Sequence, residues 1–271
     1  MSPSPGILLV GFGNMGQALA NGWLGRGYVA RHIAVVDPDD RARAAARALG
    51  LRVVDGETID QAPADVVVLA VKPAQLGDSV EPMRAAALPG AVFLSIVAGK
   101  TTAQLAALLG GRPAVVRAMP NTPAAIGRGM TVLCANDAVS DAQRRICENL
   151  VAAVGSVEWV DDESLMDAVT AISGSGPAYV FLLIECLTEA ARELGLPEDL
   201  AARLATGTVA GAGAYAEQSG VPARDLRVRV TSPQGTTQAA LDVLQGAGGL
   251  AELLRRAVHA AAERSRALSS Q

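Results

Sequence analysis

Residues 7–16 of this 271-residue chain read Ile-Leu-Leu-Val-Gly-Phe-Gly-Asn-Met-Gly, and this stretch decides the fold of the first part of the chain. Four apolar residues predict a buried strand, and Gly11, Gly13 and Gly16 follow the GxGxxG spacing that opens a helix in dinucleotide-binding units. The first glycine makes the tight turn, the second lets the backbone approach a pyrophosphate, and the third lets the helix pack on the strand. The helix N-terminus offers amide donors to the phosphates. We therefore predict a Rossmann unit that binds a dinucleotide, and an ordinary glycine-rich turn is the alternative. The residues expected to contact the nucleotide are Gly11, Phe12, Gly13, Asn14, Met15 and Gly16.

The sequence that follows extends this unit into an α/β domain. Short β-branched runs alternate with Ala-rich stretches, which is typical of βαβ units around a parallel sheet. The expected strands are 7–10, 33–37, 65–71, 91–97 and 114–119, the expected helices are 13–26, 41–49, 74–86 and 102–109, and two edge strands, 131–134 and 156–160, are expected around a helix at 141–153. We predict a Rossmann-type parallel-sheet domain over residues 1–162.

The pattern changes after residue 162, where the strand signal ends and Ala/Leu-rich helical stretches take over. We expect an all-α domain over residues 163–271, with helices at 163–172, 178–194, 197–218, 236–244 and 250–268. These helices carry small and apolar residues on most faces, more than a domain of this size can cover. A homodimer or higher homo-oligomer formed through this helical dimerisation domain accounts for the excess.

Composition and charge exclude several classes of protein. The net charge of −4, without basic blocks, gives no footprint for nucleic acid or an anionic membrane. The start MSPSPG has no signal-like apolar segment, and no uninterrupted apolar run approaches the roughly 18 residues of a membrane span, so a cytoplasmic protein is expected. Three cysteines without CxxC spacing predict buried reduced thiols, and two distant histidines argue against a catalytic metal.

Asp37 stands at the end of the second predicted strand, about 20 residues beyond the glycines, where an acidic side chain hydrogen-bonds the adenosine ribose of NAD. This argues against the 2′-phosphate of NADP. Arg41 and Arg43 follow, however, and either can turn toward a phosphate, while Asp37 can instead cap a helix that begins at Pro38. The expected cofactor is therefore NADPH or NADH.

Three further segments follow predicted strands at the carboxyl edge of the sheet, where doubly wound folds bind ligands. They are expected to contact the cofactor, and their residues are Ala70, Val71, Lys72 and Pro73, then Ala98 and Gly99, then Asn121. A solvated loop lysine is an equal alternative for Lys72, and a turn residue between prolines is the alternative for Asn121.

Two turns in the helical half lead directly into predicted helices. Residues 173–177 read SGSGP and residues 231–237 read TSPQGTT, so each places hydroxyls and backbone amides at a helix start, which suits a carboxylate. Either alone is more simply a helix cap, whereas two in one domain favour a binding site. The sequence lacks a Ser-His-Asp set and a reactive cysteine context. Hydride transfer to a protonated imine needs little more than orientation and one hydroxyl at the nitrogen.

These motifs together resemble the pyrroline-5-carboxylate reductase family, and the resemblance covers nearly the whole chain. It is carried by GFGNMG at 11–16, AVKP at 70–73, MPNTP at 119–123, SGSGPAY at 173–179 and VTSPQGTT at 230–237, together with the closing helix at 257–265. The motifs SGSGPAY at 173–179 and VTSPQGTT at 230–237 are the ones specific to this family. The resemblance implies reduction of 1-pyrroline-5-carboxylate to L-proline with NADPH or NADH, in a dimer or higher oligomer.

The resemblance also implies roles for individual residues. The substrate carboxylate lies against Ser232, Gly235 and Thr236, and the catalytic hydroxyl of Thr237 meets the ring nitrogen. The turn that lines the same pocket, in the same chain or from the partner subunit, consists of Ser173, Gly174, Ser175, Gly176 and Pro177. The segment 70–73 and Asn121 hold the nucleotide and the nicotinamide ribose.

Two residues depart from the family pattern. Gln234 stands where the family often has glycine, so a positive φ there would strain the turn, and Asp37 weakens an assignment to NADP. A related imine or β-hydroxyacid reductase is the first alternative; a β-hydroxyacid enzyme needs a proton donor such as lysine at the start of the helical half, whereas this chain has Ser173 and no lysine beyond Lys100. A non-catalytic nucleotide-binding relative is the second alternative.

Overall fold

The computed structural model describes residues 5–55, 59, 64–86 and 90–269, and its contacts divide the chain into two compact units. The sheet unit holds the chain up to Gly174 and again from Ala262 on, and the helical unit is Ser175–Ala261. Residues 163–174 and the end of the last helix thus pack with the sheet, unlike the predicted ranges 1–162 and 163–271. A functional boundary after residue 162 stays a prediction.

The sheet unit is built on eight strands in the order β3-β2-β1-β4-β5-β6-β7-β8. All neighbouring pairs are parallel except β6 and β7, which are antiparallel. The strands are β1 Ile7–Val10, β2 Ile33–Val36, β3 Arg52–Val53, β4 Val66–Leu69, β5 Val92–Ser95, β6 Ala114–Met119, β7 Gly129–Ala135 and β8 Gly155–Trp159. The seven predicted strands are confirmed, but of the two expected edge strands only β8 is at an edge, because β7 pairs with both β6 and β8. The unpredicted strand β3 has only two residues, too few to give a periodic signal.

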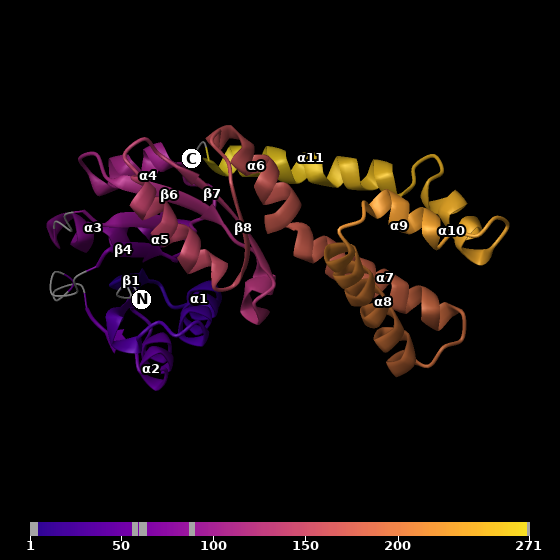
Figure 1. Cartoon of the computed structure of the whole chain (residues 1–271), viewed down its shortest axis with the longest axis horizontal. Coiled ribbons are helices and arrows are strands. Elements are labelled where there is room, and N and C mark those ends of the chain that lie inside the picture. The colour runs from indigo at the N-terminus through magenta and orange to yellow at the C-terminus, as the bar shows by residue number, and fades with distance from the viewer. Residues whose placement is uncertain (1–4, 56–58, 60–63, 87–89, 270–271) are drawn as a thin grey trace. The chain divides into compact units, whose positions relative to one another are not determined.

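Helices cover both faces of this sheet (Figure 1). Ile7 and Leu9 pack on one side with α1, α2 and α5, while Leu8 and Val10 pack on the other with α3 and α4, because successive strand residues point to opposite faces. The helices are α1 Asn14–Gly25, α2 Asp40–Ala48, α3 Leu76–Ala86, α4 Thr102–Leu109 and α5 Asp141–Ala152. Short 3-10 helices are η1 Ala30–His32, η3 Pro73–Gln75, η4 Thr122–Ile126 and η5 Glu163–Leu165.

The helix predicted at 163–172 is instead three short pieces. After η5 come α6 Met166–Val169 and a π-helix, η6, over Thr170–Gly174. The Ser173 hydroxyl donates to the carbonyl oxygen of Val169 at 3.1 Å. The predicted turn at 173–177 is therefore mostly helical, since the next helix already begins at Gly176.

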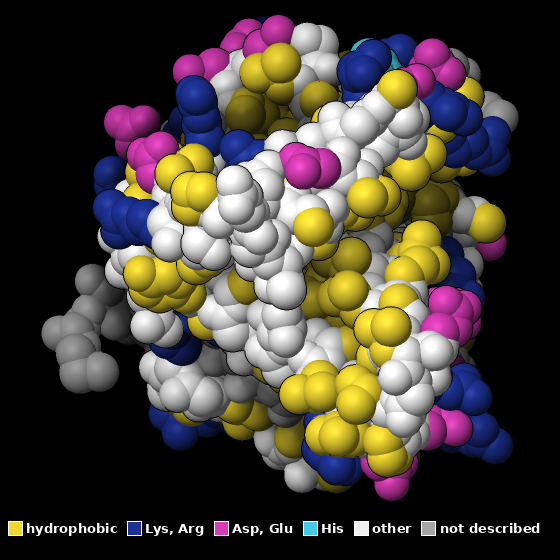
Figure 2. All heavy atoms as spheres, turned by 90° about the vertical axis from the view of Figure 1, so that its right-hand side faces the viewer, with side chains coloured by type: hydrophobic (Ala, Val, Ile, Leu, Met, Phe, Trp, Pro, Cys, Tyr) yellow, Lys and Arg dark blue, Asp and Glu magenta, His cyan; other side chains and the backbone are white. Residues whose placement is uncertain are grey.

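The helical unit consists of α7 Gly176–Glu193, α8 Glu198–Ser219, α9 Ala223–Arg229, α10 Thr236–Leu244 and the first part of α11 Leu250–Ser269. Helix α9 was not predicted, and α7 and α8 pack against each other. In the described part of this unit the buried side chains are Ala201 and Ala205 alone, whereas large apolar residues such as Phe181 and Leu182 are more than half exposed. Figure 2 shows hydrophobic side chains spread over the face that carries these helices.

The three cysteines differ in burial. Cys134 and Cys147 are buried, as expected, but Cys186 on α7 is exposed, contrary to the expectation. Burial raises the pKa of the Cys147 thiol to about 12 and raises the pKa of Cys134 as well. Both thiols thus stay protonated at neutral pH, which suits packing rather than nucleophilic chemistry.

Candidate functional site

The glycine loop between β1 and α1 has the geometry that a nucleotide-binding turn requires. Gly11 has φ +95°, and a Cβ there would lie 2.6 Å from the carbonyl oxygen of Ala70. A Cβ on Gly16 would lie 2.4 Å from the carbonyl oxygen of Gly11, so the helix packs on the turn only because position 16 is glycine. Gly13, the N-cap of α1, has open space beside it and no side-chain cap. Its neighbouring amides are therefore available to a phosphate.

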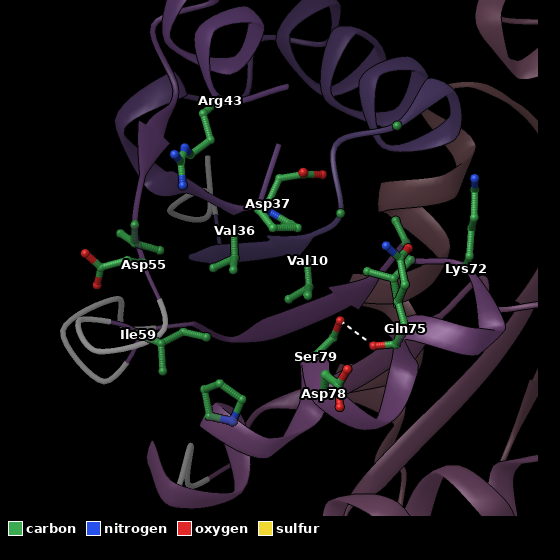
Figure 3. Close-up of a pocket in the computed structure, with 17 residues that line it drawn as sticks. Val10, Val36, Asp37, Arg43, Asp55, Ile59, Lys72, Gln75, Asp78 and Ser79 are labelled. Atoms are coloured by element: carbon green, nitrogen blue, oxygen red, sulfur yellow. Dashed lines mark hydrogen bonds between the residues drawn. The ribbon is translucent and has the colours of Figure 1, made fainter. Parts of the chain in front are cut away.

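A cavity of about 520 Å³ opens beside this loop at the carboxyl edge of the sheet (Figure 3). Its volume lies within the usual range for ligand and cofactor sites. Six predicted cofactor residues line it: Gly11, Gly13, Asp37, Ala70, Val71 and Lys72. The geometry of the loop, the volume of the cavity and the absence of a side-chain cap at the start of α1 all fit a dinucleotide.

Asp37 connects the end of β2 to the glycine loop. Its Oδ2 accepts the Phe12 N–H at 2.6 Å and its Oδ1 accepts the Asp39 N–H at 2.8 Å, while the side chain also lines the cavity. It does not cap α2, which was the alternative role: Asp39 is the N-cap and accepts from Arg41 and Ala42. Those two amides lower the pKa of Asp39.

Arg43 lines the same cavity but forms an ion pair with Asp40 one helical turn back. In Figure 3 its side chain lies at the end of the cavity where Asp55 lies, and Lys72 and Gln75 lie toward the other end. Neither Asp55 nor Asp78 was expected from the sequence to line a cavity, and both add negative charge to the lining. Asp55 follows β3 and Asp78 lies in the first turn of α3, and these positions are the only signals in the sequence that could have suggested them.

The remaining predicted cofactor residues are absent from the lining that the structure describes. The side chain of Phe12 is fully buried in the core, and Gly99, with φ +71°, packs so closely against α11 that a Cβ there would lie 3.1 Å from the Cβ of Leu268. Asn121 uses its side chain within the protein: Oδ1 accepts the Met130 N–H at 2.9 Å, and Nδ2 donates to the Ser173 carbonyl oxygen at 3.0 Å. Direct cofactor contact by these residues stays a prediction. The others in this group are Asn14, Met15, Gly16, Pro73 and Ala98.

In the helical unit, the turn before α10 has an unusual backbone. The Gly235 N–H donates to the Ser232 carbonyl oxygen at 3.1 Å, which closes a turn with Pro233 and Gln234 at its centre. Gln234 has φ +60°, the only positive φ of a non-glycine residue in the described chain. A glutamine in this region is strained, which costs about 1 kcal/mol. The sequence had predicted strain in this turn if Gln234 adopted a positive φ, and it does.

The start of α10 brings together four of the predicted substrate residues, Ser232, Gly235, Thr236 and Thr237. Gly235 is the N-cap and has no side chain to cap the helix, so the amides of the first turn, from Thr236 on, have no side-chain cap. A Cβ on Gly235 would lie 2.4 Å from the Ser232 hydroxyl, which therefore sits directly over the turn. Thr236 is exposed and Thr237 is half-buried. This arrangement can bind an anion by backbone amides and hydroxyls.

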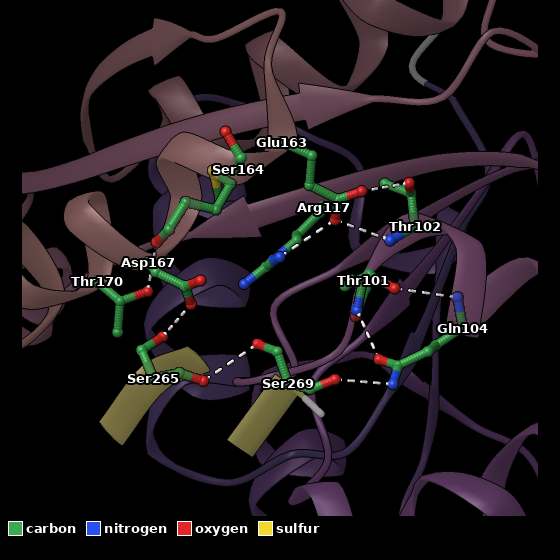
Figure 4. Close-up of polar contacts among 12 residues, drawn as sticks. Thr101, Thr102, Gln104, Arg117, Glu163, Ser164, Asp167, Thr170, Ser265 and Ser269 are labelled. Atoms are coloured by element: carbon green, nitrogen blue, oxygen red, sulfur yellow. Dashed lines mark hydrogen bonds and ion pairs between the residues drawn. The ribbon is translucent and has the colours of Figure 1, made fainter. Parts of the chain in front are cut away.

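A polar cluster in the sheet unit was missed at the sequence level (Figure 4). One Glu163 oxygen accepts the Thr102 N–H at 2.9 Å and the Arg117 Nη1 at 3.1 Å, and the other accepts the Thr102 hydroxyl at 2.6 Å. Arg117 is 5% exposed. Nearby, the Ser265 hydroxyl of α11 donates to Asp167 at 2.6 Å. These contacts join residues that are far apart in the chain, so no local sequence pattern predicts them.

Comparison with known proteins places this geometry in a family. Residues 6–99 match the family "NADP oxidoreductase coenzyme F420-dependent", and residues 163–268 match "Pyrroline-5-carboxylate reductase dimerisation". The pyrroline-5-carboxylate reductase of Pseudomonas aeruginosa is 43% identical over 99% of this chain and 98% of its own length, and that of Pisum sativum is 35% identical over 99% and 98%. The Coxiella burnetii enzyme structure superposes with a TM-score of 0.92 at 37% identity, covering 98% and 99% of the two chains.

The fold and the cavity define the class as a dinucleotide-binding oxidoreductase with a Rossmann unit and a helical unit. A solved Plasmodium falciparum pyrroline carboxylate reductase with NADP bound has a TM-score of 0.85 at 28% identity over 98% of this chain and 99% of its own. With the identities above, the chain belongs to the pyrroline-5-carboxylate reductase family.

Proposed function

We propose that this chain reduces 1-pyrroline-5-carboxylate to L-proline with NADPH or NADH, the last step of proline biosynthesis. The observation that carries the proposal is a cavity of about 520 Å³ at the glycine loop in a chain whose residues 163–268 match the reductase dimerisation family. Relatives named for this activity align with the chain from end to end.

The nucleotide is assigned to the cavity beside Gly11 and Gly13, with the amides at the start of α1 facing its phosphates. When bound, the dihydronicotinamide supplies a hydride. The hydride adds to the carbon of the protonated C=N bond, the π electrons become the nitrogen lone pair, and the product is a secondary amine. No general base is required for this step.

The substrate is assigned to the start of α10. Its carboxylate is held by the Ser232 hydroxyl and the backbone at Gly235 and Thr236, and the Thr237 hydroxyl accepts from the iminium N–H. The uncapped first turn supports this assignment, because amides without side-chain partners favour an anion. The segment Ser173 to Pro177, of this chain or of the partner subunit, is proposed to contribute to substrate binding.

The chain acts as a homodimer or higher homo-oligomer in the cytoplasm in this proposal. Residues Glu163–Glu193 are, by length and composition alone, long and apolar enough to cross a membrane, with 6% of the most apolar window buried. One such helix is weak evidence for insertion. Since this stretch overlaps the region that matches the dimerisation family, a second copy is the cover we propose for it.

A coupled assay tests the function. Purified protein is expected to oxidise NADH or NADPH when 1-pyrroline-5-carboxylate is added and to leave both unchanged without it. Nucleotide binding without turnover of the imine would instead support the non-catalytic alternative. Turnover of a β-hydroxyacid with the oxidised nucleotide, but not of the imine with the reduced one, would support the other alternative.

A further inference from the structure

We infer that Asn121 is a positioning residue that joins the loop after β6 to the Ser173–Gly174 end of η6, and through it sets the geometry of the substrate site. The inference rests on the proposed function. For the side chain of Asn121 it replaces the role of nucleotide ligand that the family resemblance implies, because the side-chain amide already has partners at both ends.

The sequence itself creates the need for this contact. Ser173 lies at the end of η6, where the last carbonyl oxygens have no donor within the element. Residue 177, which would donate to this oxygen if an α-helix continued, is proline and has no N–H. A carbonyl that lacks its helical donor must find another partner. The Asn121 Nδ2 donates to this oxygen at 3.0 Å, across 52 residues of sequence.

The loop after β6 holds Asn121 rigidly for this purpose. Its Oδ1 accepts the Met130 N–H at 2.9 Å, and its own carbonyl oxygen accepts the Ala124 N–H at 3.1 Å. Prolines stand on both sides, at positions 120 and 123. A side chain that is fixed at one end and donates from the other transfers the position of its loop to the group it binds.

A second contact between the same two segments is steric. A Cβ on Gly174 would lie 2.4 Å from the Cε of Met119, so only glycine lets the end of η6 approach the end of β6 this closely. The chain also takes a π-helical turn over Thr170–Gly174, a form that is rare and concentrates at functional sites. The motifs around Asn121 and Ser173 are therefore two halves of one structural feature.

The functional consequence follows from where the two segments lie in the chain. The loop with Asn121 leaves the carboxyl edge of the sheet, the edge that carries the nucleotide cavity, and Ser173 opens the segment assigned to the substrate. Orientation of the reacting groups contributes strongly to hydride transfer. Loss of the Asn121 contact is thus expected to impair the use of the imine while nucleotide affinity is retained.

The chain offers a matched control in Asn136, which follows β7 and lies near the opposite end of the β6–β7 pair. Its Oδ1 accepts the Val115 N–H at 3.1 Å, and its Nδ2 donates to the Pro113 carbonyl oxygen at 3.0 Å. Asn121→Asp and Asn136→Asp therefore make the same chemical change: each keeps an acceptor and turns an amide donor into a carboxylate that faces a carbonyl oxygen.

The test compares these two variants with the wild type by steady-state kinetics and by nucleotide titration in a calorimeter. Asn121→Asp is expected to lower kcat/KM for 1-pyrroline-5-carboxylate at least tenfold with nucleotide Kd within twofold of wild type. Asn136→Asp is expected to lower the melting temperature similarly and to keep kcat/KM within twofold. Asn121→Ser, which adds no charge, provides the same comparison if the aspartate variant does not fold.

Equal kinetic effects in the two variants, or no kinetic effect at position 121, would overturn the inference. So would a loss of nucleotide affinity as large as the loss of kcat/KM, since Asn121 would then act as a nucleotide ligand. A wild-type protein without imine turnover would refute the proposed function itself. Failure of the proposed function is thus distinguishable from failure of the inference on Asn121.

Discussion

At the scale of single residues, a few side chains carry most of the proposed chemistry. Thr237 lies in the first turn of α10, beside the turn of Ser232 and Gly235. Its hydroxyl is the group assigned to the ring nitrogen of the substrate. In the turn before α10, Ser232 is proposed to act through its hydroxyl and Gly235 through its backbone, while Gln234 has a strained φ of +60°.

Thr237→Ala is expected to lower kcat/KM for the imine by at least tenfold. The reason is that a hydrogen bond to a charged group contributes about 1.5–3 kcal/mol, and this one is formed with the iminium. Thr237→Ser keeps the hydroxyl and is expected to retain most of the activity. Thr188→Ala is the matched control, because that hydroxyl donates to Ile184 within α7 at 2.8 Å. Steady-state kinetics of the three variants give the comparison, and equal values for Thr237→Ala and the control would contradict the role.

Asp37 is expected to make the protein bind NADH more tightly than NADPH. Its carboxylate lines the cavity between Phe12 and Asp39, and Arg43, the nearby cation, is paired with Asp40. A 2′-phosphate near Asp37 is repelled, whereas a 2′-hydroxyl donates to it. Asp37→Asn is expected to shift the ratio of the two Kd values toward NADPH by roughly fivefold, which corresponds to about 1 kcal/mol.

Calorimetric titration of both nucleotides measures this shift. The control is Asp78→Asn, a second carboxylate of the cavity lining that belongs to α3 rather than to the end of β2. An equal shift in both variants would assign the effect to overall charge, and no shift in Asp37→Asn would remove this residue from nucleotide selection.

At the scale of elements, buried polar contacts decide how the later segments of the chain join the sheet. Glu163 of η5 bonds the first turn of α4 through Thr102 and the strand β6 through Arg117. Gln104 donates to the carbonyl oxygen of Ser269 at 2.9 Å, and Ser265 donates to Asp167. The end of α11 is thereby attached to the sheet unit rather than to the helices that precede it.

Glu163→Ala is expected to lower the free energy of unfolding by about 2–3 kcal/mol. The substitution removes three hydrogen bonds and leaves Arg117, which is almost fully buried, without its carboxylate partner. This loss of stability is smaller than the loss expected when one partner is removed from a fully buried ion pair, because the Glu163 side chain is 25% exposed. Urea unfolding provides the measurement. Glu158→Ala, at an exposed position of β8, is the control, and a loss as small as in that variant would contradict this prediction.

At the scale of the whole molecule, the helical unit exposes more apolar surface than a single soluble chain can sustain. Phe181, Leu182 and Val243 are 56%, 58% and 77% exposed, and the described part of the unit has almost no buried side chains of its own. A soluble protein rarely leaves so large an apolar surface uncovered. The match of residues 163–268 to a dimerisation family agrees with cover by another chain.

Light scattering after size-exclusion chromatography is expected to give a mass of at least two chains. Phe181→Asp places a charge on the apolar surface and is expected to shift the mass toward one chain, because an unpaired charge is costly in an interface. Ile126→Asp is the control, since Ile126 is 78% exposed but belongs to the sheet unit. A wild-type monomer would contradict the proposed oligomer.

Local patterns were sufficient for much of the architecture. The strand, glycine loop and helix of residues 7–25 follow from short-range rules, because strand burial, tight turns and helix starts depend on neighbours in sequence. The same rules located the later strands, the change to helices after residue 162 and the start of α10. They failed at β3, which is too short for a pattern, and at the helix expected over 163–172.

The sequence by itself thus determined the α/β class and the motifs that mark the family, and it predicted the nucleotide site at the glycine loop. Only the tertiary structure decided that β7 runs antiparallel to β6, that Asp37 bonds the glycine loop, and that Glu163 anchors buried Arg117. It also decided that the Asn121 side chain donates to the carbonyl oxygen of Ser173 at the end of η6. The physical reason is the same in each case: propensity and periodicity act over a few residues, whereas these contacts join groups that become neighbours only when the chain folds.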